Sequence, residues 1–111
     1  VVNCLIYKLI KSNDPEEQIH LKYEIITLNK EVLKIAEQEL NNQRSEGLSC
    51  DYRIYATISL SNLLENKTTN YQQYKQEFED NLTENWEMES FNKTKKLRKK
   101  ANKMLKKINY Q

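Results

Sequence analysis

Residues 14–40 read DPEEQIHLKYEIITLNKEVLKIAEQEL, and this stretch decides the fold class of the chain. Asp14 is a favourable helix cap, Pro15 suits the first helical position, and the acidic residues that follow complement the positive end of the helix dipole. Apolar residues then recur at steps of three and four along two neighbouring lines: Leu21, Ile25, Leu28, Val32 and Ile35, and Ile19, Tyr23, Ile26, Leu33, Ala36 and Leu40. These lines cover about half of the helix circumference at 100° per residue. The stretch therefore predicts a central helix that touches several others.

The segments around this helix extend the all-helical prediction. A short helix is expected from about Val2 to Ile10, a polar loop from Asn41 to Gly47, and a polar break from Asn66 to Asn70. From Tyr71 an apolar stripe continues through Tyr74, Phe78, Leu82 and Trp86. The whole apolar pattern after Tyr71 fits either one bent helix or two helices that meet near residues 83–92. We favour two helices, with Thr83 or Ser90 as the cap.

One segment is ambiguous. Between Tyr52 and Leu60, apolar residues alternate with Arg53, Tyr55, Thr57 and Ser59, and a period of two is typical of a strand. No second alternating segment exists to pair with it, and a lone strand leaves its backbone polar groups without partners. We therefore predict a helix from about Cys50 to Leu64 that is buried on most sides.

Composition limits the architecture further. The chain has 111 residues with one Gly and one Pro, too few for the tight turns of a sandwich or barrel. We expect a single helical domain over residues 1–111, a compact all-α bundle of four to five helices. The apolar run that starts at Val1 is cut short by Lys8, so no membrane-spanning helix is expected. The start at Val1 shows no signal-peptide pattern, so we expect any leader to have been removed.

Cysteines and sequons indicate the compartment. Cys4 and Cys50 are the only thiols, and a disulfide between them is expected to close the bundle. Asn-x-Thr triplets begin at Asn66, Asn81 and Asn92, which makes these residues candidate glycosylation sites. Together the two signals predict a secreted, extracellular protein; the alternative is two buried free cysteines and sequons that arise by chance.

No residue pattern favours catalysis. His20 is the only histidine, and Glu17-Gln18-Ile19-His20 is one half of a di-iron motif that needs two such halves and several inward carboxylates. His20 also falls on the polar side of its helix. The cysteine spacing suits neither a redox pair nor a zinc site. We therefore expect neither an enzyme, a catalytic residue, a metal site nor a cofactor.

Charge is divided along the chain. Residues 1–92 carry nine Lys and Arg against sixteen Asp and Glu, whereas residues 93–111 carry nine basic residues and no acidic one. The last helix should therefore have an apolar face and a basic face, and the candidate binding face consists of Lys96, Lys99, Lys100, Lys103, Lys106 and Lys107. Such a face suits a solvated surface, docking on an acidic protein or binding at a membrane surface. The run Lys95-Lys96-Leu97-Arg98-Lys99-Lys100 suits a heparin-like polyanion. Nucleic acid is not expected as a partner, because the rest of the chain is acidic.

With Cys4, Cys50, the three sequons and the helical pattern, the chain resembles the small secreted all-helical salivary proteins of blood-feeding insects. Within that group it is similar to the mosquito salivary family that inhibits the alternative pathway of complement, with relatives that act on coagulation. The resemblance covers the whole chain and carries no residue roles. It implies a non-enzymatic protein that inhibits a host plasma defence or clotting cascade by binding a plasma protein or protein complex. Two alternatives stay open: a helical cytokine-like ligand and an intracellular helical adaptor fragment.

Overall fold

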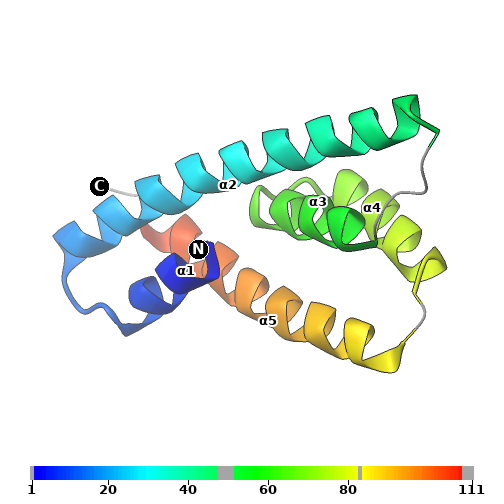
Figure 1. The fold of residues 1–111 in the computed structure, drawn as a ribbon. Coiled ribbons are helices and arrows are strands. Elements are labelled where there is room, and N and C mark those ends of the chain that lie inside the picture. The colour runs from blue at the N-terminus through cyan, green and yellow to red at the C-terminus, as the bar shows by residue number, and fades with distance from the viewer. Residues whose placement is uncertain (1, 48–51, 83, 109–111) are drawn as a thin grey trace.

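The computed structural model describes residues 2–47, 52–82 and 84–108. These residues form five helices, which are α1 (Val2–Lys11), α2 (Pro15–Ser45), α3 (Tyr52–Leu64), α4 (Thr68–Asp80) and α5 (Asn85–Ile108) (Figure 1). The described part of the chain contains no strand. The prediction of an all-α bundle of four to five helices is confirmed.

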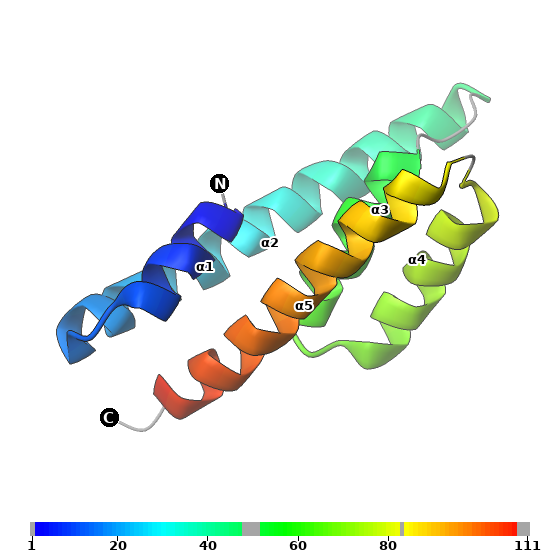
Figure 2. The same cartoon turned by 90° about the horizontal axis from the view of Figure 1, so that it is seen from below.

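Helix α2 sets the length of the molecule. Its 31 residues span about 46 Å at 1.5 Å per residue, close to the longest dimension of 48 Å. The N-terminal half of α2 lies beside α1 (Figure 2), and both of these helices contact α5. Figure 1 shows the two long helices diverging from this end of the molecule toward the opposite end. Helices α3 and α4 fill the space between them there (Figure 1).

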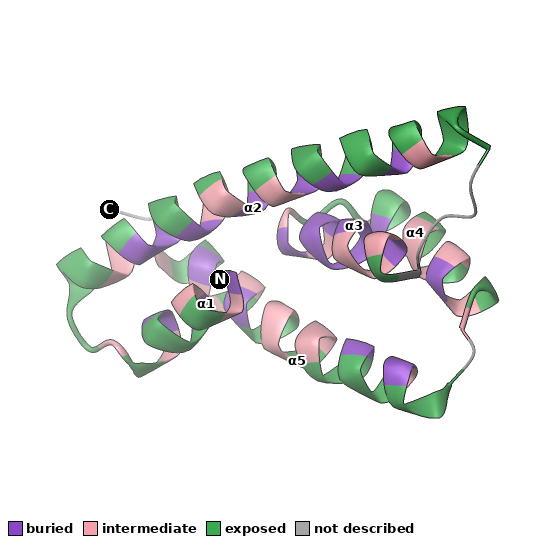
Figure 3. Cartoon of the chain, viewed as in Figure 1, coloured by how far each residue is buried: buried purple, intermediate pink, exposed green. Residues whose placement is uncertain are grey.

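Two hydrophobic clusters divide the core along this long axis. One cluster joins α3, α4, the C-terminal half of α2 and the start of α5; its buried members are Leu33, Ala36, Leu40, Tyr55, Ile58, Leu60, Tyr71, Phe78 and Phe91. The other joins α1, the first half of α2, the end of α3 and the second half of α5; its buried members are Val2, Ile6, Leu9, Leu21, Ile25, Leu64, Ala101 and Leu105. Figure 3 shows the buried positions facing the interior of the bundle.

The start of α2 follows the prediction, but its buried face is narrower than expected. Asp14 caps the helix, because its side-chain oxygen accepts a hydrogen bond from the Glu16 N–H at 3.0 Å. The buried positions are Leu21, Lys22, Ile25, Asn29, Leu33, Ala36 and Leu40. Ile35 and Tyr23, expected on the apolar lines, are 65% and 66% exposed. The partner helices cover a single stripe of α2, and residues beside that stripe reach solvent.

The prediction of a loop from Asn41 to Gly47 is wrong, because α2 continues through Ser45. Helical geometry persists without apolar residues: the Gln43 side-chain amide donates to the Glu39 carboxylate at 3.1 Å. Gly47 has φ +72°, a left-handed conformation that favours glycine just beyond a helix end.

The ambiguous segment is helical, so the prediction of a helix that ends at Leu64 is confirmed. Helix α3 packs against α2, α4 and α5, which explains why its apolar residues are not confined to one stripe. Six of its residues between Ile58 and Leu64 are buried, including polar Ser59, Ser61 and Asn62. A helix surrounded by partners loses the usual 3.6-residue signature, and this segment shows period two by coincidence.

The chain after Tyr71 forms two helices, as predicted, with α4 ending at Asp80 and α5 beginning at Asn85. Ser90 lies inside α5, so its assignment as a cap is wrong; Thr83 lies outside the described residues. Phe78 of α4 stacks on Phe91 of α5 with ring centroids 4.6 Å apart. Trp86 was expected on the apolar stripe but is 60% exposed.

The expected Cys4–Cys50 disulfide is not supported. Cys4 is an exposed, free cysteine on the solvent side of α1, whereas Val2, Ile6 and Leu9 take the buried side. Cys50 lies outside the described residues. The packing of α1 therefore comes from apolar burial.

Candidate binding surface on helix α5

Helix α5 separates buried and charged residues onto different faces. Phe91, Ala101 and Leu105 are buried, and helical steps of three and four keep the predicted lysines away from them. All six are exposed: Lys96, Lys99, Lys100, Lys103, Lys106 and Lys107. None of them has a hydrogen-bond or ion-pair partner within the described residues. We call this set the basic face.

The run of basic residues at 95–100 does not form one continuous patch, because two of its members turn inward. The Lys95 ammonium lies 5.7 Å from the centroid of the Tyr71 ring, within range of a cation–π contact. Arg98 Nε donates to Asn3 Oδ1 at 3.0 Å, and its Nη1 donates to the Leu60 carbonyl at 3.4 Å. The outward charge of this run therefore comes from Lys96, Lys99 and Lys100.

Arg98 joins three helices. Its bonds connect α5 to α1 and α3, and burial lowers the pKa of its guanidinium to about 10. At neutral pH the group is still charged. Sequence reasoning placed Arg98 within a candidate polyanion site, but its contacts give it a structural role.

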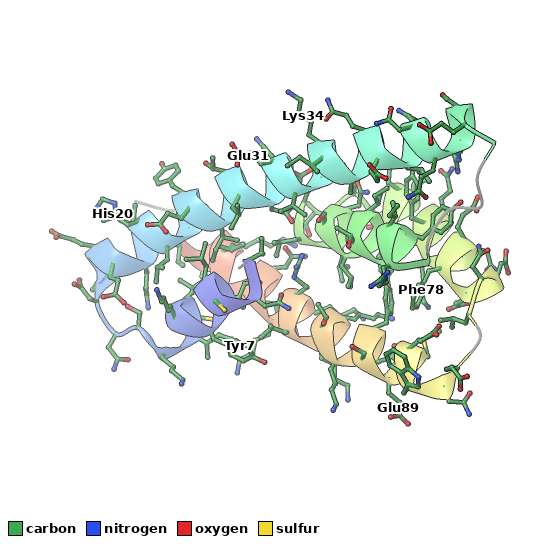
Figure 4. All side chains as sticks on the ribbon, viewed as in Figure 1. Tyr7, His20, Glu31, Lys34, Phe78 and Glu89 are labelled. Carbon is green, nitrogen blue, oxygen red and sulfur yellow. The ribbon has the colours of Figure 1, made fainter. Side chains whose placement is uncertain are left out.

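Acidic side chains gather at the other end of α5. Asp80, Glu84 and Glu89 are exposed around the turn between α4 and α5, and Figure 4 shows Glu89 pointing away from the bundle. Glu79 pairs with Lys75 at 3.5 Å, and Glu87 is buried. The charges on α5 run from acidic at its N-terminus to basic at its C-terminus, an order that complements the helix dipole. Along α5 and the turn before it, the separation of charge in the sequence is thus also a separation in space.

The remaining predicted site residues lie apart from the basic face or outside any cluster. Asn66, Asn81 and Asn92 are all exposed, the first two in turns and the third within α5. His20 is exposed on α2 (Figure 4). Over the described ranges, no three His, Cys, Asp or Glu residues gather as a metal site would require. None of the five described helices combines the length and apolar character needed to cross a membrane.

Sequence reasoning missed a cavity of about 440 Å³ between α2, the C-terminal end of α3 and α5. Four lysines line it, Lys22, Lys30, Lys67 and Lys106, together with Asn29, Glu65 and Asn102. One signal was present in the sequence: Asn29 stands four residues after Ile25 and four before Leu33, a polar residue in a buried stripe.

The chain matches no protein-family model, no curated protein and no solved structure.

Proposed function

We propose that this chain is a secreted, non-enzymatic binding protein that inhibits a host plasma defence or clotting cascade, with the alternative pathway of complement as the favoured target. It acts by docking on an acidic surface of a plasma protein or protein complex. The observation that carries this proposal is the basic face, six exposed lysines without partners among the described residues, on one side of α5.

The basic face suits docking because its charges are not neutralised by the described part of the chain. Unpaired surface lysines attract an acidic partner over about 8 Å at physiological salt, and this attraction mainly raises the association rate. A sulfated polysaccharide offers the same negative charge, so contact with a polyanion through this face is part of the proposal.

The extracellular part of the proposal rests on the sequons. Asn66, Asn81 and Asn92 are exposed, as glycosylation requires, and Asn66 and Asn81 lie in turns. A Cys4–Cys50 bridge adds no support, because Cys4 is free in the structure. Secretion from an insect or mammalian cell, followed by glycosidase treatment and mass measurement, tests this part directly.

Function is tested by lysis of erythrocytes through the alternative pathway in diluted plasma. The wild type should inhibit lysis in a dose-dependent manner. Replacing four lysines of the basic face by Gln should weaken inhibition about tenfold and make it less sensitive to salt; the four are Lys99, Lys100, Lys103 and Lys107. The matched control replaces four exposed lysines of α1 and α2, which are Lys8, Lys11, Lys30 and Lys34.

Two outcomes would contradict the proposal. If the wild type inhibits neither lysis nor clotting in plasma, it is not a cascade inhibitor, and the cytokine-like or adaptor alternative takes its place. If both quadruple variants inhibit as strongly as the wild type, the basic face is only solvated surface. The interface would then lie elsewhere, and Tyr7 and Tyr23, 54% and 66% exposed, are the first residues to replace.

A further inference from the structure

We infer that the cavity between α2, α3 and α5 binds a small hydroxylated molecule that carries a phosphate group. This site shares Lys106 with the basic face, but its ligand is a small molecule and its binding does not depend on docking to a plasma protein. The cavity volume of about 440 Å³ falls in the usual range of small-molecule sites, roughly 300–1,000 Å³.

Lysines make the cavity a site for an anion. Lys30 of α2 and Lys106 of α5 are exposed at its walls, and neither has a hydrogen-bond or ion-pair partner among the described residues. The single carboxylate in the lining, Glu65, pairs through Oε2 with Lys67 at 3.3 Å, and its buried Oε1 has no hydrogen-bond partner among the described residues. Positive charge is therefore in excess, and two unpartnered ammonium groups match a phosphate monoester, which carries about −1.5 to −2 charges at neutral pH.

Asn29, one of the residues that line the cavity, carries a buried polar acceptor. It is 1% exposed, and its Nδ2 donates to the carbonyl of Ser61 at 3.0 Å. Only the amide nitrogen can donate to a carbonyl, so this bond fixes which end of the side chain is the oxygen. Asn29 Oδ1 is buried and has no hydrogen-bond partner among the described residues.

An unpaired buried acceptor next to a cavity indicates a ligand with a donor. Leaving such an atom without a partner destabilises a protein, so a natural sequence seldom keeps one without a use. A hydroxyl group of the ligand supplies the missing donor once the flexible lysine side chains that share the lining move. Ile26, Leu64 and Leu105 give the rest of the lining apolar character, which suits the carbon skeleton of a sugar or polyol.

Glucose 6-phosphate is the probe, titrated at low salt into the unglycosylated chain so that Asn66, which also lines the cavity, carries no glycan. Calorimetry should give a Kd below about 1 mM. The side-chain amide signal of Asn29 should shift in a nitrogen–proton NMR spectrum. That of Asn62, whose amide donates to the Ile58 carbonyl and which does not line the cavity, should stay in place.

Two double variants test the location. Lys30→Gln with Lys106→Gln should weaken binding about tenfold, the sum of two exposed ion pairs. Lys34→Gln with Lys103→Gln removes the same charge from the same two helices but outside the cavity, and should change Kd less than about twofold. Figure 4 shows Lys34 pointing away from the bundle. All four residues are exposed, so neither variant should disturb folding.

Three results would overturn the inference. The first is the absence of both heat and NMR shifts at about 10 mM ligand, a concentration that detects even weak sites. The second is an equal loss of affinity in the two double variants, which would mean general surface attraction. The third is equally tight binding of unphosphorylated glucose or of inorganic phosphate, because then either the lysines or the Asn29 acceptor contributes nothing.

Discussion

Asn29→Leu should make this protein more stable, although the residue lies in the buried stripe of its longest helix. Asn29 is 1% exposed, and its Oδ1 has no hydrogen-bond partner among the described residues. Leucine has nearly the same shape and carries no polar atom. Its neighbours along the stripe are Ile25 and Leu33, so an apolar side chain suits the position.

The magnitude follows from two opposing effects of the substitution on the free energy of unfolding. Removing a buried unpaired acceptor recovers about 1–3 kcal/mol, and breaking the hydrogen bond from Nδ2 to Ser61 costs about 0.5–1.5 kcal/mol. The Ser61 carbonyl is not orphaned, because it still accepts from the Glu65 N–H at 3.2 Å. Taking the middle of each range, the net rise in unfolding free energy is about 1 kcal/mol, equivalent to a rise in Tm of about 4–8 °C.

Asn102→Leu is the matched control. The Asn102 amide donates to the Leu63 carbonyl at 2.6 Å, the same kind of bond to the end of α3. Its side-chain oxygen is not among the buried atoms without partners, so the substitution breaks a hydrogen bond and removes no buried unpaired acceptor. We expect Asn102→Leu to lower the unfolding free energy by about 0.5–1.5 kcal/mol. Urea unfolding followed by circular dichroism at 222 nm measures both variants.

The reasoning is refuted if Asn29→Leu destabilises the protein as much as Asn102→Leu does. That result would mean that Asn29 Oδ1 is satisfied in solution and that its burial costs nothing. The Asn29 side chain would then serve only to stabilise the fold. The argument that its oxygen accepts a hydrogen bond from a ligand in the cavity would lose its basis.

Three further predictions concern packing, titration and the free thiol. Ile25→Ala should cost about 2–5 kcal/mol of unfolding free energy, whereas Ile35→Ala on the same helix should change it by less than about 0.5 kcal/mol, because these residues are 0% and 65% exposed. Burial raises the pKa of the Tyr71 phenol above 10.0, so the folded state favours the neutral form and stability falls as pH rises above that value. Tyr71→Phe should reduce this alkaline loss of unfolding free energy, measured by urea titrations at several pH values. An unchanged pH profile would contradict the raised pKa of Tyr71. Cys4 should react with a thiol reagent in the native protein, and peptide mass mapping should find the label on Cys4, whereas an unreactive Cys4 would restore the disulfide prediction.

Local signals in the sequence predicted the helices well. The Asp14-Pro15 start of α2 depends on a cap and a dihedral preference, both properties of neighbouring residues, and the structure has it as expected. The end of α2 was missed, because no neighbouring residue forces a stop before Gly47. The alternating segment that begins at Tyr52 was correctly assigned to a helix, because no other segment of the sequence could pair with it as a strand.

Four features could be predicted without tertiary information: the helical class, the start of α2, the break before α5 and the outward position of the basic face. Each of them depends on contacts within a few residues or on one helical period. Three other features depend on how the helices pack: which stripe of α2 is buried, the inward turn of Arg98 toward Asn3 and Leu60, and the cavity that Lys30 and Lys106 line together. The two bonds of Arg98 alone join residues 38 and 95 positions apart. Such contacts form when distant helices pack, and helical periodicity carries no information about which partner each face meets.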